Sequence, residues 1–255
     1  MTTGSATNRG ISMNKSGVPY ATHCLNTMIG CLHGCDYCYS RRIIKRYSNG
    51  KETGEVHTAP KGNPYPFGFD PTYFPHRLEE PYKVKEPCRI FWNDMGDMFG
   101  DWWPHEIIEA NLQVMRETPW HTHLLLTKNP KRYQEFEIPG NCWVGTTCED
   151  NSKLHRIDEL LQANANLYWV SHEPAMGELD IAPYLPYIGW FVTGAMSGPN
   201  AVPMDEDWAR DIRDACVEYG VPFFYKQKIV NCKKVEMPEL DGKVWDQIPS
   251  GGQDC

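Results

Sequence analysis

Six short apolar runs constrain the fold of this chain more than any other feature of its sequence. They span residues 89–92, 123–126, 142–146, 167–171, 188–193 and 222–225. Each run is rich in aromatic or β-branched residues, and none alternates apolar with polar positions. This pattern is typical of parallel strands that are buried on both faces of a sheet.

Amphipathic helical stripes separate several of these runs. Their apolar residues are, in chain order, Ile107, Ile108, Leu112 and Met115; Leu154, Ile157, Leu160 and Leu161; and Trp208, Ile212, Cys216 and Tyr219. Pro104 stands where a first helical turn accepts a proline, and Gly220 can end the third helix. Strands that alternate with helices predict a parallel sheet with right-handed crossovers. With one more strand before residue 31 the count reaches six or seven, so we expect an α/β fold of the partial (β/α)6-barrel type.

The length of 255 residues suits one such domain. We expect a flexible N-terminus over 1–16, a single partial barrel over 17–235 and a C-terminal tail over 236–255. Within the barrel, residues 40–88 are rich in Gly, Pro and Tyr and predict a long irregular insertion, either a lid or a wrapping arm with a short helix at 75–80. No apolar run approaches the roughly 18 residues that span a membrane, and no signal peptide is evident. We therefore predict a cytoplasmic protein without a membrane partner.

Three cysteines lie within eight residues, in the loop Cys31-Leu-His-Gly-Cys35-Asp-Tyr-Cys38. Three thiolates on one short loop can hold three corners of a [4Fe–4S] cluster and leave the fourth iron open to a substrate or cofactor. The alternative is a structural zinc site with Cys24 or His33 as fourth ligand. Zinc sites usually add a second cysteine or histidine pair, whereas the remaining cysteines of this chain are scattered singly. The spacing therefore favours an iron–sulfur centre.

The cysteine loop resembles the cluster loop of the radical S-adenosylmethionine (radical-SAM) superfamily. Further blocks resemble, in the same order, a small phage-type branch of that superfamily whose function is undefined. These blocks are M-G-D-x-F at 95–99, L-L-T-K at 125–128, S-G-P-x-x-x-P-M at 197–204 and F-F-x-K-Q at 223–227. The cysteine loop and the L-T-K block are also similar to spore photoproduct lyase and its relatives.

The resemblance implies an enzyme with a [4Fe–4S] cluster and S-adenosylmethionine (SAM) as cofactors. Cys31, Cys35 and Cys38 would ligate the cluster, and the open iron would bind the amino and carboxylate groups of SAM. Tyr37 would pack near the adenine. The reduced cluster would cleave a carbon–sulfur bond of SAM, and the 5′-deoxyadenosyl radical would abstract hydrogen from a substrate.

The resemblance also implies that residues at the strand ends bind SAM. The residues concerned are Asp94, Asp97, Lys128, Thr146, Thr147 and Glu149. Asp94 and Asp97 would accept hydrogen bonds from the amino nitrogen, Lys128 would meet the carboxylate, and the two threonines would face the ribose. For Asp97 and Lys128 the alternative is a salt bridge, and for the threonines it is an ordinary strand-end hydroxyl. Glu149 could instead form a structural pair with Arg156.

Basic residues follow the cysteine loop and several predicted strand ends, although the chain has a net charge of −8. They are Arg41, Arg42, Lys45, Arg46, Lys128, Lys131, Arg132, Lys226, Lys228, Lys233 and Lys234. A positive rim would attract an anionic substrate: a nucleotide or short nucleic-acid segment first, a carboxylated small molecule second. The alternative is that these are solvated loop residues. The resemblance further implies an external electron donor such as flavodoxin or ferredoxin. The competing function is a non-catalytic zinc-binding or interaction protein.

Overall fold

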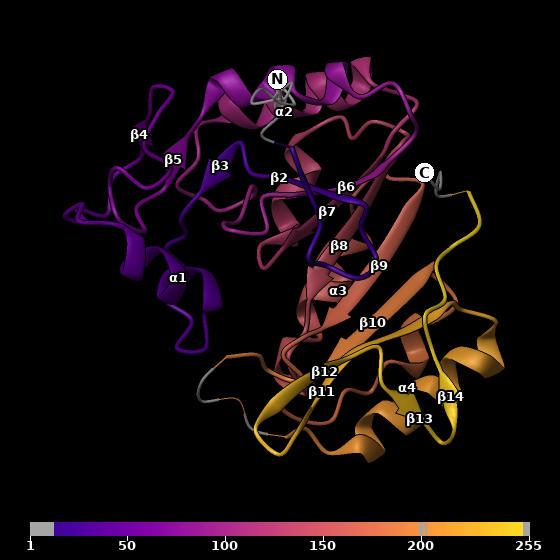
Figure 1. Cartoon of the computed structure of the whole chain (residues 1–255). Helices are drawn as coiled ribbons and strands as arrows, with labels where there is room; N and C mark the ends of the chain where they lie inside the picture. Colours follow the sequence, from indigo (N-terminus) through magenta and orange to yellow (C-terminus); the bar gives the residue numbers. More distant parts are fainter. Residues whose placement is uncertain (1–12, 199–200, 202, 252–255) are drawn as a thin grey trace, which may run out of the picture.

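A largely parallel sheet forms the centre of the molecule (Figure 1). The computed structural model describes residues 13–198, 201 and 203–251, and its nine-stranded sheet has the order β1-β2-β6-β7-β8-β9-β10-β11-β12. The parallel strands are β2 (His23–Leu25), β6 (Arg89–Trp92), β7 (Thr122–Thr127), β8 (Cys142–Thr147), β9 (Leu167–His172), β10 (Trp190–Gly194) and β11 (Phe223–Val230). β1 (Asn14–Lys15) and β12 (Lys233–Glu236) flank them as antiparallel edges. The six apolar runs correspond to β6–β11, so the predicted parallel sheet is confirmed.

The parallel strands lie side by side in chain order, as in a (β/α) barrel and unlike a doubly wound sheet, whose order reverses at a switch point. Three crossovers carry the predicted α-helices, α2 (His105–Glu117), α3 (His155–Leu160, after the 3-10 turn η4 at Asn151–Lys153) and α4 (Glu206–Tyr219). Two others contain only 3-10 turns, η3 (Pro130–Glu135) and η5 (Ala182–Tyr184). The regular strand–helix alternation is therefore incomplete in these two connections.

The expected irregular insertion over 40–88 begins with a regular helix. Residues Tyr39–Tyr47 form helix α1, which the sequence pattern did not predict. The Cys38 side chain caps this helix by accepting a hydrogen bond from the Arg41 N–H at 3.4 Å. The rest is mostly irregular. Its strands β4 (His57–Thr58) and β5 (Thr72–Tyr73) form a small sheet with β3 (Met28–Ile29), which precedes the cysteine loop. The short helix expected at 75–80 is present as the 3-10 helix η1 (Pro75–Glu79), followed by η2 (Pro81–Lys83).

The two ends of the described chain pack on the sheet. Most of the expected flexible N-terminus lies in 1–12, outside the described residues, but β1 pairs with β2. After β12, a hairpin of β13 (Glu239–Leu240) and β14 (Lys243–Val244) leads to Trp245, whose ring lies 6.0 Å from that of Phe223. None of the described helices has the length and apolar character needed to cross a membrane. The division into N-terminus, barrel and tail stays a prediction.

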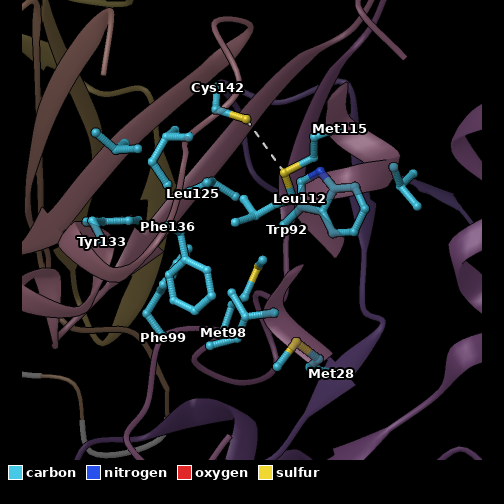
Figure 2. Close-up of a cluster of buried hydrophobic side chains, with 14 of the residues drawn as sticks. Met28, Trp92, Met98, Phe99, Leu112, Met115, Leu125, Tyr133, Phe136 and Cys142 are labelled. Atoms are coloured by element: carbon cyan, nitrogen blue, oxygen red, sulfur yellow. Dashed lines mark hydrogen bonds between the residues drawn. The ribbon is translucent and has the colours of Figure 1, made fainter. Parts of the chain in front are cut away.

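Three clusters of buried side chains cover the faces of the sheet: one lies under α2, one under α3 and α4, and the third, rich in aromatic rings, lies on the opposite face. Figure 2 shows the cluster under α2, where Trp92 and Leu125 of the strands meet Leu112 and Met115 of the helix. On the opposite face, strand side chains from β6 to β11 surround Tyr20, which precedes β2. The Tyr20 ring lies 5.1–6.0 Å from the rings of Phe91, Trp169, Trp190 and Phe224. This inner face is therefore a packed core, as in other (β/α) barrels.

His123 of β7 is held as a neutral ring in the core. Its Nδ1 accepts a hydrogen bond from the Trp92 indole N–H at 2.9 Å, and its Nε2 lies 3.1 Å from the Thr118 hydroxyl. Burial lowers the pKa of His123 to about 3. The unfolded chain takes up this proton near the ordinary histidine value of about 6.5, so acid favours unfolding. We expect the free energy of unfolding to fall by about 2 kcal/mol between pH 7 and pH 5 because of this one residue.

Urea unfolding at pH 7 and pH 5 measures this effect. His123→Gln should remove about that much of the pH dependence, whereas His155→Gln, at the exposed start of α3, should leave it unchanged. The same pH dependence in wild type and His123→Gln would contradict the assignment.

Candidate functional site

A cleft of about 420 Å³ opens where the parallel strands end. Its lining includes all three loop cysteines together with residues from the ends of several strands: Asp94, Asp97, Lys128, Thr147, Glu173 and Lys226. The structure thus brings together most of the side chains that the sequence assigned to one site from separate segments. We refer to this space as the cleft.

The cysteine loop is shaped by close backbone approach. Gly30, just before it, has φ +87°, and a Cβ there would lie 2.3 Å from the carbonyl oxygen of Asp70, so only glycine fits. After this turn, the His33 N–H lies 3.5 Å from the Cys31 Sγ. The Cys38 Sγ sits at the start of α1 and accepts a hydrogen bond from the Arg41 N–H at 3.4 Å.

The chemistry of this donor set fits an iron–sulfur cluster. The three half-buried thiols face one cleft, and two of them have a backbone N–H aimed at sulfur. Burial, with the nearby charge of Asp97, raises the pKa of Cys31. That thiol is therefore protonated in the free loop, and a metal centre would supply the positive charge that releases the proton.

The two candidate fourth ligands of a zinc site have other partners. The Sγ of Cys24, on β2, lies 3.1 Å from the Ser16 hydroxyl, and Nε2 of His33 is bonded to Asp97. Among the described residues, no three His, Cys, Asp or Glu side chains, the loop cysteines included, are grouped so that they could hold one metal ion.

Glu149 forms the pair with Arg156 that the sequence left open, and it also binds Lys128. Its Oε2 accepts a hydrogen bond from Arg156 at 2.9 Å, and its Oε1 accepts from both Lys128 and Tyr37. Lys128 Nζ also donates to the Tyr37 hydroxyl at 2.7 Å. Burial alone would raise the pKa of Glu149, but Lys128, Tyr37 and Arg156 hold it below its usual value. Two cations, Lys128 and Arg156, thus share the one carboxylate of Glu149.

The two predicted aspartates differ in their free acceptor capacity. Asp97 is buried, and its carboxylate accepts four hydrogen bonds, from His33, Thr127, Phe99 and Lys128. An ionised carboxylate offers about four acceptor positions, so none is left for a ligand.

Asp94 keeps acceptor capacity and lines the cleft. Its Oδ1 accepts from Asn26 at 2.6 Å, while the contact that the described residues make with Oδ2 is a long one, of 3.4 Å, from the Tyr39 hydroxyl. Burial raises the pKa of Asp94, although the charge of Lys226 acts in the opposite direction. The geometry favours Asp94 over Asp97 as the acceptor for a cationic group.

The two threonines at the end of β8 point in different directions, because successive strand side chains face opposite ways. The Thr146 hydroxyl donates to the Thr127 carbonyl oxygen at 2.9 Å, while Thr147 lines the cleft. Of the two, Thr147 is the one placed to contact a ligand.

Most cations of the expected positive rim are paired with carboxylates. Lys226 donates hydrogen bonds to both oxygens of Glu173, at 2.7 and 2.8 Å. Glu173 directly follows β9, so its place at a strand end could have indicated it as a site residue from the sequence. The other pairs are Lys128–Glu149, Arg41–Glu52, Arg132–Glu135, Lys228–Glu206 and Lys234–Glu236. Six of the eleven rim cations are therefore paired in the described part of the chain, and the rim carries less net charge than the sequence suggested. Beneath it, Tyr20, Phe91 and Leu126 give the cleft an apolar floor.

A family model described as "Protein of unknown function (DUF5131)" matches residues 15–249. The chain belongs to the DUF5131 family. No curated protein sequence matches it. The phage-type resemblance stays a prediction.

Solved structures of spore photoproduct lyase share the fold of this DUF5131 protein. The lyase complexed with dinucleoside spore photoproduct aligns with a TM-score of 0.53 at 11% identity, over 83% of this chain and 76% of the lyase chain. A mutant lyase with the same dinucleoside gives a TM-score of 0.52 at 11% identity over the same shares. The chain spans 64% of the length of another lyase structure, which has bound AdoMet. At this identity the likeness shows the fold alone. Because the lyase has a radical-SAM fold, the predicted fold class is confirmed.

Proposed function

We propose that this DUF5131 protein is a radical-SAM enzyme. The observation that carries the proposal is the gathering of all three thiols of the C-x3-C-x2-C loop with Asp94, Lys128 and Thr147 in one cleft. The cysteines would hold a [4Fe–4S] cluster, which when reduced supplies one electron to cleave a carbon–sulfur bond of SAM and start radical chemistry. An external electron donor such as flavodoxin or ferredoxin would deliver that electron.

The chain's own residues would bind and orient SAM. Lys128 would meet the SAM carboxylate, while Arg156 keeps Glu149 paired. Asp94 would accept hydrogen bonds from the SAM ammonium group, whose charge would favour the ionised carboxylate. Tyr37 would pack near the adenine and Thr147 would face the ribose.

The floor of the cleft is apolar. Tyr20, Phe91 and Leu126 line it, although Tyr20 and Phe91 are almost fully covered by their core neighbours. One lyase structure is complexed with a dinucleoside spore photoproduct, which supports a nucleotide or short nucleic-acid segment ahead of a carboxylated small molecule. Since most rim cations are paired, we expect apolar contact with the floor to contribute more to substrate affinity than phosphate contacts.

Anaerobic reconstitution with iron and sulfide tests the proposal. The expected product is a brown protein whose absorbance changes on addition of SAM, and which releases 5′-deoxyadenosine after reduction. Nucleotides or oligonucleotides should accelerate that release, with carboxylated metabolites as the comparison set. A colourless protein with one tightly held zinc ion would instead support the non-catalytic function.

A further inference from the structure

One buried carboxylate connects the cysteine loop to the end of β7. Asp97 Oδ2 accepts hydrogen bonds from His33 Nε2 at 2.8 Å and from the Lys128 N–H at 2.9 Å. Its Oδ1 accepts from the Thr127 hydroxyl at 2.7 Å and from the Phe99 N–H at 3.0 Å. Only 5% of Asp97 is exposed, so these bonds are shielded from competing water.

His33 occupies the position midway between Cys31 and Cys35. Its ring lies edge-on to Trp102, with the centroids 5.0 Å apart at 74°, and its side chain reaches from the loop to Asp97. Between the two cysteines, this is the side chain that joins the loop to the strand ends.

A backbone contact fixes the same loop on the other side of Cys31. The Gly30 N–H donates to the Met95 carbonyl oxygen at 3.0 Å, and Gly30 forms a parallel bridge with Gly96. A Cβ on Gly96 would lie 2.9 Å from the Gly30 oxygen, so this approach requires glycine. Segment 95–97 thus holds the cysteine loop at two points, before and after Cys31.

We infer that Asp97, acting through His33, is a positioning residue that sets the place of Cys31 and Cys35 relative to the end of β7. The third thiol is held separately, because Cys38 caps α1. The effect on a bound cluster rests on the proposed function. The positioning of the loop does not, because the hydrogen bonds of Asp97 are present in the protein without a cluster. A loop ordered in advance loses less conformational entropy when the three thiolates bind iron.

The first measurement is amide hydrogen exchange of the apoprotein. His33→Ala should speed exchange in residues 31–36 about tenfold, the factor expected from losing a hydrogen bond to a charged group. Exchange in α1 should stay unchanged. His33→Gln, whose amide N–H can reach Asp97, should restore slow exchange. His155→Ala, at an exposed histidine of α3, is the matched control and should behave as wild type.

The second measurement follows the reconstituted protein. His33→Ala should retain less iron and sulfide than wild type and should alter the electron paramagnetic resonance spectrum of the reduced cluster, with His33→Gln closer to wild type. Asp97→Asn should show the same changes, and His33→Ala decides the question if Asp97→Asn does not fold.

Wild-type exchange rates in His33→Ala would overturn the inference. If wild-type protein binds no cluster, the proposed function fails, but the exchange measurement on the apoprotein still decides whether Asp97 and His33 position the loop.

Discussion

Replacing any one of Cys31, Cys35 or Cys38 by alanine is expected to abolish reductive cleavage of SAM. Each removes one of three cluster ligands, and the described structure offers no nearby cysteine in the same loop to take its place. The measurement is 5′-deoxyadenosine release by the anaerobically reconstituted variants, together with their iron and sulfide content. We expect loss of both.

Cys216→Ala is the matched control for these variants. Cys216 lies buried on α4, packed in the core away from the cleft, so its loss should affect stability slightly and cleavage very little. Cys24→Ala tests whether the fourth iron lacks a cysteine ligand. If that variant also lost the cluster, a site with four cysteines would be indicated and the argument for an open iron would fail.

Lys128→Met is expected to weaken SAM affinity by about 2–3 kcal/mol, which corresponds to about 30- to 150-fold in the dissociation constant. Methionine approximates the length of lysine but offers no charge to the SAM carboxylate. Glu149 keeps its bond to Arg156, so the variant does not leave this carboxylate without a cation. Calorimetry on reconstituted protein measures the affinity, and the cluster spectrum without SAM should match wild type.

Lys131→Met provides the control for Lys128→Met, because Lys131 is exposed on η3, three residues further along the chain. It should bind SAM as wild type does. Equal affinity in Lys128→Met and Lys131→Met would assign Lys128 a structural role in the network with Tyr37 and Glu149.

The parallel sheet could be predicted because its strands are buried on both faces, and burial leaves a direct mark as apolar runs. Helix α1 could not, because only Ser40 and Ile44 of its residues are buried and its cap is a cysteine rather than a usual capping residue. The short 3-10 connections η3 and η5 could not be predicted either. Apolar runs indicate where strands lie, but they do not indicate whether the segment between two strands is an α-helix or a short turn.

The location of the candidate site could be predicted from the sequence, but the hydrogen-bond partners of its residues could not. Strand ends indicated Lys128, Thr147 and Glu149 because such positions converge in a barrel. Side chains from distant segments decide which carboxylate can still accept a hydrogen bond from a ligand. His33 occupies an acceptor position of Asp97, whereas Oδ2 of Asp94 has a long contact with Tyr39 and can still accept. Such contacts leave no local pattern in the chain.

The central position of Tyr20 has a consequence for how the protein folds. This ring lies near the start of the chain, yet its neighbours come from β6, β9, β10 and β11, the last of which is near the opposite end. Contacts between residues so far apart in sequence form late and slow folding. The ring of neighbours around Tyr20 is complete only once β11 has been synthesised, and the apolar inner face stays open to chaperones or to aggregation until then.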